Sequence, residues 1–93
     1  MIVSFGDTDT AELHHQGHSR RFPADIHRAA ARKLDMLDAA ARLEDLRAPP
    51  GNRLEALTTD RVGWHSIRVN DRWRLVFRWI DGAVHDVTLL DYH

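Results

Sequence analysis

Cysteine is absent from this sequence of 93 residues. Its absence excludes disulfide bonds and thiolate metal sites, and it fits a reducing compartment. No apolar run approaches the ~20 residues that a membrane-spanning helix needs. The first ten residues hold two aspartates and no basic residue, which is not typical of a secretory signal peptide. We therefore expect a cytoplasmic protein with no membrane segment, folded as one domain over residues 1–93.

The basic residues are unevenly placed, although the net charge at pH 7 is −1. Segment 19–33 holds five basic residues and one aspartate, and segment 53–78 holds six arginines and three acidic residues. Twelve arginines accompany one lysine. A guanidinium is the better fork for a phosphate, although a GC-rich genome produces the same bias. The net charge argues against nucleic acid as a partner, whereas the two basic segments favour it.

The first half of the chain predicts a short strand and two helices. Residues 2–5 form an apolar run, and a threonine at position 8 or 10 can cap a short helix that ends at about Gln16, before Gly17. Pro23 precedes an alanine-rich segment with an apolar stripe of helical period, which predicts a long helix over 24–41. The stripe comprises Ile26, Ala30, Lys33 or Leu34, Leu37, Ala40 or Ala41, and Leu43.

After the loop at residues 49–52 the hydrophobic period changes to two. Residues 72–79 alternate between large apolar and mostly basic side chains, which predicts a half-buried antiparallel strand. Residues 66–69 alternate in the same way before it. Asp81-Gly82 predicts a hairpin turn into a last strand over 84–90. Residues 87–90 are apolar on both faces, so the register of that strand stays open.

The connection between the first two of these strands decides which face the arginines occupy. A two-residue loop at Asn70-Asp71 would place Arg68 on the apolar face, whereas a loop of residues 70–72 pairs Arg68 with Arg74. We favour the second register, which puts Arg68, Arg74 and Arg78 on the open face. The predicted fold class is α+β, with a short N-terminal strand, two helices, and a three-stranded antiparallel meander that carries the helices on one face.

Three segments of the second half carry a family resemblance in their order and spacing. They are residues 43–46 with 49–57 (LEDL and PPGNRLEAL), residues 64–74 (WHSIRVNDRWR), and the closing Asp91-Tyr92-His93. With this pattern the chain resembles the HigB-type toxins of the RelE/ParE superfamily, and the layout of the first half agrees with a RelE-like fold. The match runs from about Leu43 to His93, over half of the chain.

The resemblance implies a toxin of a type II toxin–antitoxin system. Such a toxin is a metal-independent endoribonuclease that needs no cofactor and cuts mRNA in the ribosomal A site, which stops translation and growth. Its partners are then the ribosome, mRNA, and a HigA-like helix-turn-helix antitoxin, through which it reaches DNA.

The resemblance assigns catalysis to Asp91, Tyr92, His93 and Arg74. RNA can be cut without a metal because its own 2′-hydroxyl attacks the adjacent phosphate. Histidine is the natural proton carrier near neutral pH, so His93 is expected to act as base or acid. Arg74 is expected to hold the phosphate, Tyr92 to stack on a base or donate a hydrogen bond, and Asp91 to orient a partner or take part in proton transfer.

Further basic residues are expected to bind RNA. Some relatives carry a histidine where this chain has Arg53, which supplies charge and no proton transfer. The family also often has a basic residue at the position of Val62. The first departure argues against a simple two-histidine mechanism, and both could reduce ribosome affinity or activity. The expected RNA contacts are Arg68, Arg53, Arg20, Arg21, Arg32 and Lys33, of which the last four could instead contact an acidic antitoxin or remain solvated.

Three other readings compete with the endonuclease. The chain could be a catalytically weak RelE-fold module that acts as antitoxin partner and transcriptional corepressor. A DNA-binding regulator is disfavoured, because no helix-turn-helix with a basic recognition helix is visible. A metal site at His14, His15 and His18 is disfavoured as well, because Gly17 is expected to end the helix before His18.

Overall fold

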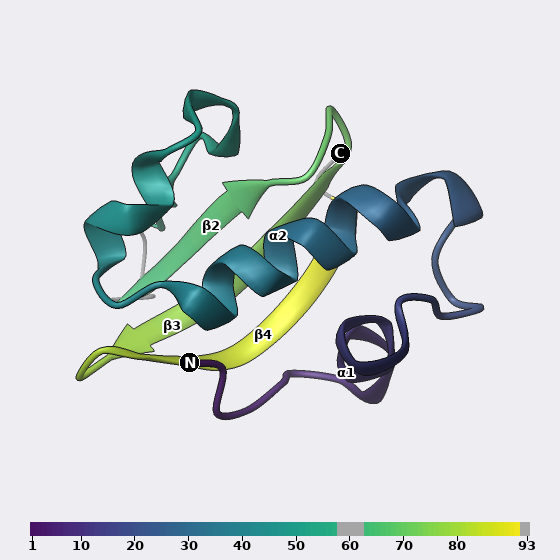
Figure 1. Cartoon of the computed structure of the whole chain (residues 1–93), viewed down its shortest axis with the longest axis horizontal. Helices are drawn as coiled ribbons and strands as arrows, with labels where there is room; N and C mark the ends of the chain where they lie inside the picture. The colour runs from purple at the N-terminus through teal and green to yellow at the C-terminus, as the bar shows by residue number, and fades with distance from the viewer. Residues whose placement is uncertain (58–62, 92–93) are drawn as a thin grey trace.

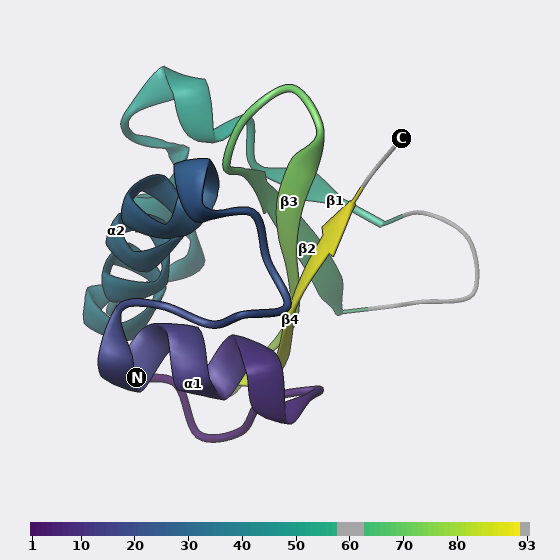
Figure 2. The same ribbon diagram turned by 90° about the vertical axis from the view of Figure 1, so that its right-hand side faces the viewer.

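A four-stranded antiparallel sheet carries the helices on one face (Figures 1 and 2). The computed structural model describes residues 1–57 and 63–91, so the expectations for Val62, Tyr92 and His93 lie outside the described residues. The strand order is β1-β2-β3-β4. The elements in chain order are α1 (Thr8–Gln16), η1 (Ala24–Ile26), α2 (His27–Ala39), η2 (Leu43–Arg47), η3 (Pro50–Asn52), β1 (Glu55–Ala56), β2 (Trp64–Arg68), β3 (Trp73–Ile80) and β4 (Ala83–Asp91).

Helix α1 ends where expected but is capped by a different residue. Its stop is Gly17, which adopts the left-handed conformation (φ 82°) and donates its N–H to the Leu13 carbonyl at 2.9 Å. The cap is Asp7, whose carboxylate accepts the Thr10 N–H at 2.6 Å, so the expected threonine cap was wrong. The Thr10 hydroxyl is buried and accepts the Leu89 N–H at 3.0 Å, which ties α1 to β4.

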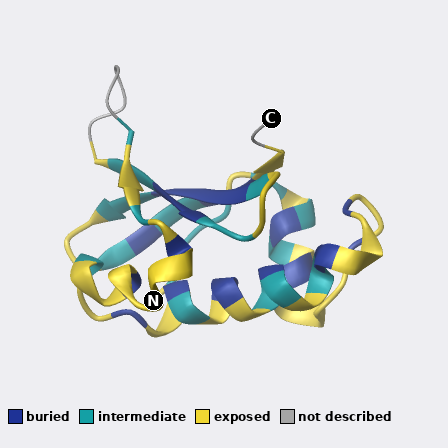
Figure 3. Ribbon diagram, turned by 90° about the horizontal axis from the view of Figure 1, so that it is seen from above, coloured by how far each residue is buried: buried dark blue, intermediate teal, exposed yellow. Residues whose placement is uncertain are grey.

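The expected long helix forms in two parts, a short 3₁₀ turn (η1) followed by α2, which ends at Ala39. The apolar stripe is confirmed on its buried side, since Ala30, Leu34 and Leu37 are fully buried against the sheet. Lys33 shares that side and is 6% exposed. Figure 3 shows the buried band running through the sheet and along the facing side of α2.

The predicted register of the two central strands is confirmed. Arg68 pairs with Arg74 and Ile67 with Leu75, and the Val69 N–H donates to the Trp73 carbonyl at 2.8 Å. The Asn70 side chain closes the three-residue loop, because its Oδ1 accepts the N–H groups of Arg72 and Trp73 at 2.8 and 2.9 Å. Arg68, Arg74 and Arg78 therefore lie on the face of the sheet opposite to the helices.

The β3–β4 hairpin turns at Asp81-Gly82, as predicted. Both residues have positive φ (49° and 78°), as a two-residue hairpin loop with the right twist requires. The ladder is irregular between Val76 and Arg78, opposite Asp86, which also has a positive φ of 55°. The Arg78 guanidinium donates to the Asp86 carboxylate at 2.8 Å across this irregularity.

Two features of the sheet differ from the prediction. The apolar N-terminal run makes two isolated parallel bridges to β4, Ile2 with Val84 and Phe5 with Val87, in place of a continuous strand. A two-residue strand, β1, adds a fourth strand beside β2. The core lies between the sheet and α2, with Phe77 and Leu75 fully buried. Within residues 1–57 and 63–91 no helix is long and apolar enough to cross a membrane.

Candidate active site

Arg74 is buried at the centre of the face opposite to the helices, with 8% of its surface exposed. Its Nε donates to the Ser66 hydroxyl at 2.9 Å and its Nη2 to the Arg53 carbonyl at 2.7 Å. Glu55 Oε1 lies 4.0 Å from the same Nη2. A guanidinium is planar, so these contacts fix its orientation. The prediction that Arg74 lies on an open face is therefore corrected: β1 and the loop before it cover this part of the sheet.

A hollow of about 320 Å³ lies beside Arg74. It brings together Arg53, Arg68 and Arg74, which come from the loop before β1, from β2 and from β3. Their charges are partly balanced by two carboxylates. The lining residues are Arg53, Glu55, Arg68, Asn70, Asp71 and Arg74.

The three arginine side chains differ in the hydrogen bonds and ion pairs that they make within the protein. Arg68 forms an ion pair with Asp71, which is itself 94% exposed in its side chain. The Arg53 side chain is exposed and makes no hydrogen bond or ion pair within residues 1–57 and 63–91. Arg53 thus offers the guanidinium that is most available to a ligand, and Arg74 the one that is most firmly oriented.

The position of Arg53 is fixed from α2. Lys33 Nζ donates to the Asn52 side-chain oxygen, and the Asn52 amide donates to the carbonyls of Leu46 and Ala48 at 3.1 and 3.3 Å. Asn52 is fully buried, and the next residue, Arg53, has a left-handed backbone (φ 44°). Burial lowers the pKa of Lys33, helped by the nearby charges of Arg32 and Arg68. The expected RNA contact of Lys33 is thus corrected: it is a buried anchor for this loop.

Replacing Asn52 by alanine is expected to destabilise the fold by about 2–3 kcal/mol, because the change strands a buried ammonium and two carbonyls. Urea unfolding measures the loss. In a Lys33→Met background the same replacement should cost clearly less, because no charge is left without a partner. An equal loss in both backgrounds would show that the pair is not the source of the stability.

Asp91 is the last residue of β4, which lies on the opposite side of β3 from β2. It pairs with Trp73, the neighbour of Arg74, and its carboxylate accepts a hydrogen bond from Arg72 Nη2 at 2.6 Å. This contact raises the pKa of Arg72, because the carboxylate stabilises the charged form. The chain continues from here into Tyr92 and His93, which lie outside the described residues.

The remaining basic residues named from the sequence are apart from the hollow. Arg20 and Arg32 are exposed, and Arg21 forms an ion pair with Asp9 at 3.1 Å. Sequence reasoning missed Ser66 and Glu55, which contact the Arg74 side chain directly. Ser66 falls two residues before Arg68, so the alternation that placed the arginines also places this hydroxyl on their face.

A cluster of guanidinium groups around a hollow can hold a phosphate and stabilise charge that develops on it. Within the described part of the chain, no group of three or more histidine, aspartate or glutamate side chains is arranged to hold a metal ion.

Comparison with known proteins adds a family. A family model described as the RelE-like toxin of type II toxin-antitoxin system HigB matches residues 3–93. The chain is 51% identical over 94 residues to Toxin HigB-1 of Vibrio cholerae, covering 100% of this chain and 98% of that protein. It is 33% identical over 94 residues to Endoribonuclease HigB of Proteus vulgaris, covering 100% of both. An uncharacterized protein of Haemophilus influenzae is 39% identical over 88 residues, covering 95% of this chain and 77% of that protein.

Proposed function

The chain belongs to the RelE-like HigB toxins of type II toxin–antitoxin systems, and we propose that it is an endoribonuclease that cuts mRNA on the ribosome. An antitoxin partner follows from the type II class, and we propose that it is a helix-turn-helix protein. The relative from Proteus vulgaris is named an endoribonuclease. The proposed place of action is the cytoplasm, where translating ribosomes are found.

One observation of the structure carries the proposal: Arg53, Arg68 and Arg74 line one hollow. These residues lie within 21 positions of one another in the sequence and come from the loop before β1, from β2 and from β3, so the fold gathers three guanidinium groups at a single place on a chain of net charge −1. The hollow adjoins the start of β3. On the neighbouring strand β4, Asp91 pairs with Trp73, the residue next to Arg74. A phosphate of RNA fits this charge. The proposed catalytic residues Tyr92 and His93 directly follow Asp91 in the sequence.

The proposed reaction uses the substrate's own nucleophile. The 2′-oxygen forms a bond to the adjacent phosphorus, and the bond from phosphorus to the 5′-oxygen breaks. A base takes the proton of the 2′-hydroxyl and an acid gives one to the leaving 5′-oxygen, which leaves a cyclic phosphate and a 5′-hydroxyl. We propose His93 for one of these proton transfers, because an imidazole changes protonation near neutral pH.

Arg74 is proposed to stabilise the negative charge that grows on the phosphate oxygens in the transition state. Its fixed plane suits this role, since no reorganisation is needed when the charge develops. Arg53 and Arg68 are proposed to attract and hold the RNA. Asp91 is proposed as a positioning residue, because its carboxylate is engaged by Arg72. Tyr92 is proposed to stack on a base or donate a hydrogen bond.

The exposed Arg20 and Arg32 are proposed to contact ribosomal RNA outside the hollow. Arg21 is a weaker contributor to this surface, because Asp9 already neutralises its charge.

Induction of the native chain in growing bacteria tests the function. We expect growth arrest and new 5′ ends of a translated message at ribosome-occupied codons, both suppressed when the antitoxin is co-expressed. Primer extension on a matched message with its start codon removed is the control, and it should stay uncut. Arrest without cleavage would refute the nuclease. Neither arrest nor cleavage, with tight antitoxin binding, would favour the corepressor.

A further inference from the structure

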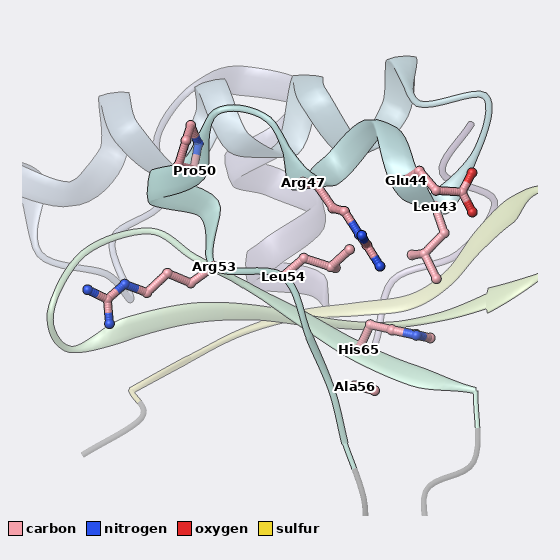
Figure 4. Close-up of a pocket in the computed structure, with 8 residues that line it drawn as sticks. All are labelled: Leu43, Glu44, Arg47, Pro50, Arg53, Leu54, Ala56 and His65. Carbon is pink, nitrogen blue, oxygen red and sulfur yellow. The ribbon is translucent and has the colours of Figure 1, made fainter.

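A second hollow, of about 400 Å³, shares the lining residue Arg53 with the first, and Figure 4 shows the residues around it. It is bounded by η2 and η3 on one side and by β1 and β2 on the other. Arg53 lines both hollows, so the two adjoin along the β1 edge of the sheet. The lining residues are Leu43, Glu44, Arg47, Pro50, Arg53, Leu54, Ala56 and His65.

One cation, Arg47, extends over this hollow. Arg47 is an exposed residue of η2, and Figure 4 shows its guanidinium extending between Leu54 and Leu43, into the space above His65. Within the described residues neither Arg47 nor the Arg53 side chain has a hydrogen bond or ion pair. The Arg53 guanidinium points away from Arg47, so Arg47 is the cation that extends over this hollow, where an anionic ligand could meet it.

The element that carries Arg47 is held in place. Asp45 accepts the backbone N–H groups of Ala41 and Arg42, both at 3.0 Å, which pins the start of η2. These two donors lower the pKa of Asp45, so the carboxylate is charged at neutral pH. At the end of η2 the Leu46 carbonyl accepts from the buried Asn52.

His65 gives the hollow a hydrogen-bond acceptor. Its Nδ1 lies 3.2 Å from the Gly63 carbonyl, and a carbonyl can only accept, so Nδ1 carries the proton. In the neutral ring Nε2 then carries a lone pair. The ring is stacked on Phe77, with centroids 6.1 Å apart and planes 22° apart, which fixes its direction. Beside it, Leu43, Leu54, Pro50 and Ala56 form an apolar wall.

We propose that this hollow binds a second nucleotide of the RNA, adjacent to the nucleotide whose phosphate is cut. Its base lies against the apolar wall, with an exocyclic amino group donating to His65 Nε2, and its phosphate accepts from Arg47. Adenine, cytosine and guanine carry such an amino group and uracil does not, so the hollow selects against uridine. The inference rests on the proposed function.

A nucleotide fits these groups better than an acidic peptide segment does. A carboxylate side chain would satisfy Arg47 but offers no donor to His65, whereas a nucleotide combines an anionic phosphate with an amino group and a flat apolar ring. Arg53, which lines both hollows, links them at the β1 edge of the sheet.

Cleavage of mRNA on purified programmed ribosomes tests the proposal through Arg47→Ala and His65→Phe. Arg47→Ala should raise the half-saturating ribosome concentration about 10-fold and leave the plateau rate within about 2-fold, the loss of one charged contact. His65→Phe keeps an aromatic ring against Phe77 but loses the hydrogen-bond acceptor. The variant should therefore lose the preference against uridine at the position that flanks the cut. Arg28→Ala, an exposed cation of α2 outside both hollows, is the charge-matched control and should change neither value.

The inference is overturned if Arg47→Ala behaves like Arg28→Ala, or if it weakens antitoxin binding and leaves the half-saturating concentration unchanged. If the native chain cuts nothing, the proposed function fails first. Equilibrium binding of fluorescent RNA tetranucleotides to the same variants then tests the hollow by itself. An affinity that depends on Arg47 and falls with uridine supports it, and an affinity that ignores both refutes it.

Discussion

Replacement of Arg74 by alanine is expected to slow RNA cleavage on the ribosome by about 100-fold to 1,000-fold. In other active sites, removal of one fixed hydrogen-bond donor that faces developing negative charge slows the reaction by a similar factor. Two anchoring contacts, to Ser66 and to the Arg53 carbonyl, hold the guanidinium plane. Single-turnover cleavage at saturating ribosome concentration measures the effect. Arg74→Lys should recover little of the rate, because an ammonium keeps the charge but loses the planar fork.

The control for Arg74 is Arg78→Ala, on the same strand and the same face but paired with Asp86 and outside the hollow. It should leave the rate within about 2-fold, a change of roughly 0.4 kcal/mol in barrier. Since Arg74 is buried, both variants should also be compared by urea unfolding, with rates taken where each is fully folded. A folded Arg74→Ala protein that cuts at the native rate would remove Arg74 from the mechanism.

Replacement of His93 by alanine is expected to slow cleavage by about 100-fold to 10,000-fold, the usual contribution of a positioned proton carrier. The expectation comes from the closing Asp91-Tyr92-His93 pattern and from the chemistry of the 2′-hydroxyl. Arg53 cannot replace the lost group, because a guanidinium does not release its proton. The single-turnover rate as a function of pH measures the effect.

The native profile should bend near the imidazole pKa, and His93→Ala should lose that bend while the other limb remains. His18→Ala is the matched control, because His18 is an exposed histidine in the first half of the chain. It should keep both the rate and the profile. A native-like rate in His93→Ala would leave the hollow as an RNA site and transfer the proton chemistry to another residue.

The sequence predicted the elements whose pattern repeats several times. The stripe that includes Ala30, Leu34 and Leu37 specified the buried side of α2, and the alternation over residues 72–79 specified β3. The alternation of side chains between the two faces decided the register as well, because a shift by one residue would have moved Arg68 to the apolar face. The turn at Asp81-Gly82 followed from residues that tolerate positive φ.

The sequence did not predict β1, because two residues, Glu55 and Ala56, are too few to show any period. It also gave no sign that the N-terminal run would make two isolated bridges. The run meets β4 only in the folded chain, where the Ser4 hydroxyl accepts the Asp86 N–H from more than 80 positions away. Short segments take their structure from the neighbours they meet, which local propensity does not encode.

The sequence by itself determined the α+β class, the shared face of Arg68 and Arg74, and a resemblance that named the family. Periodicity, turn chemistry and motif order are local, so they can be read along one chain. The tertiary structure decided that Lys33 is a buried anchor, that Arg74 is held by the Arg53 carbonyl, and that Arg53 lines two hollows. These facts depend on contacts between residues roughly 20 positions apart, and burial of a charge is settled by the partner that the fold brings to it.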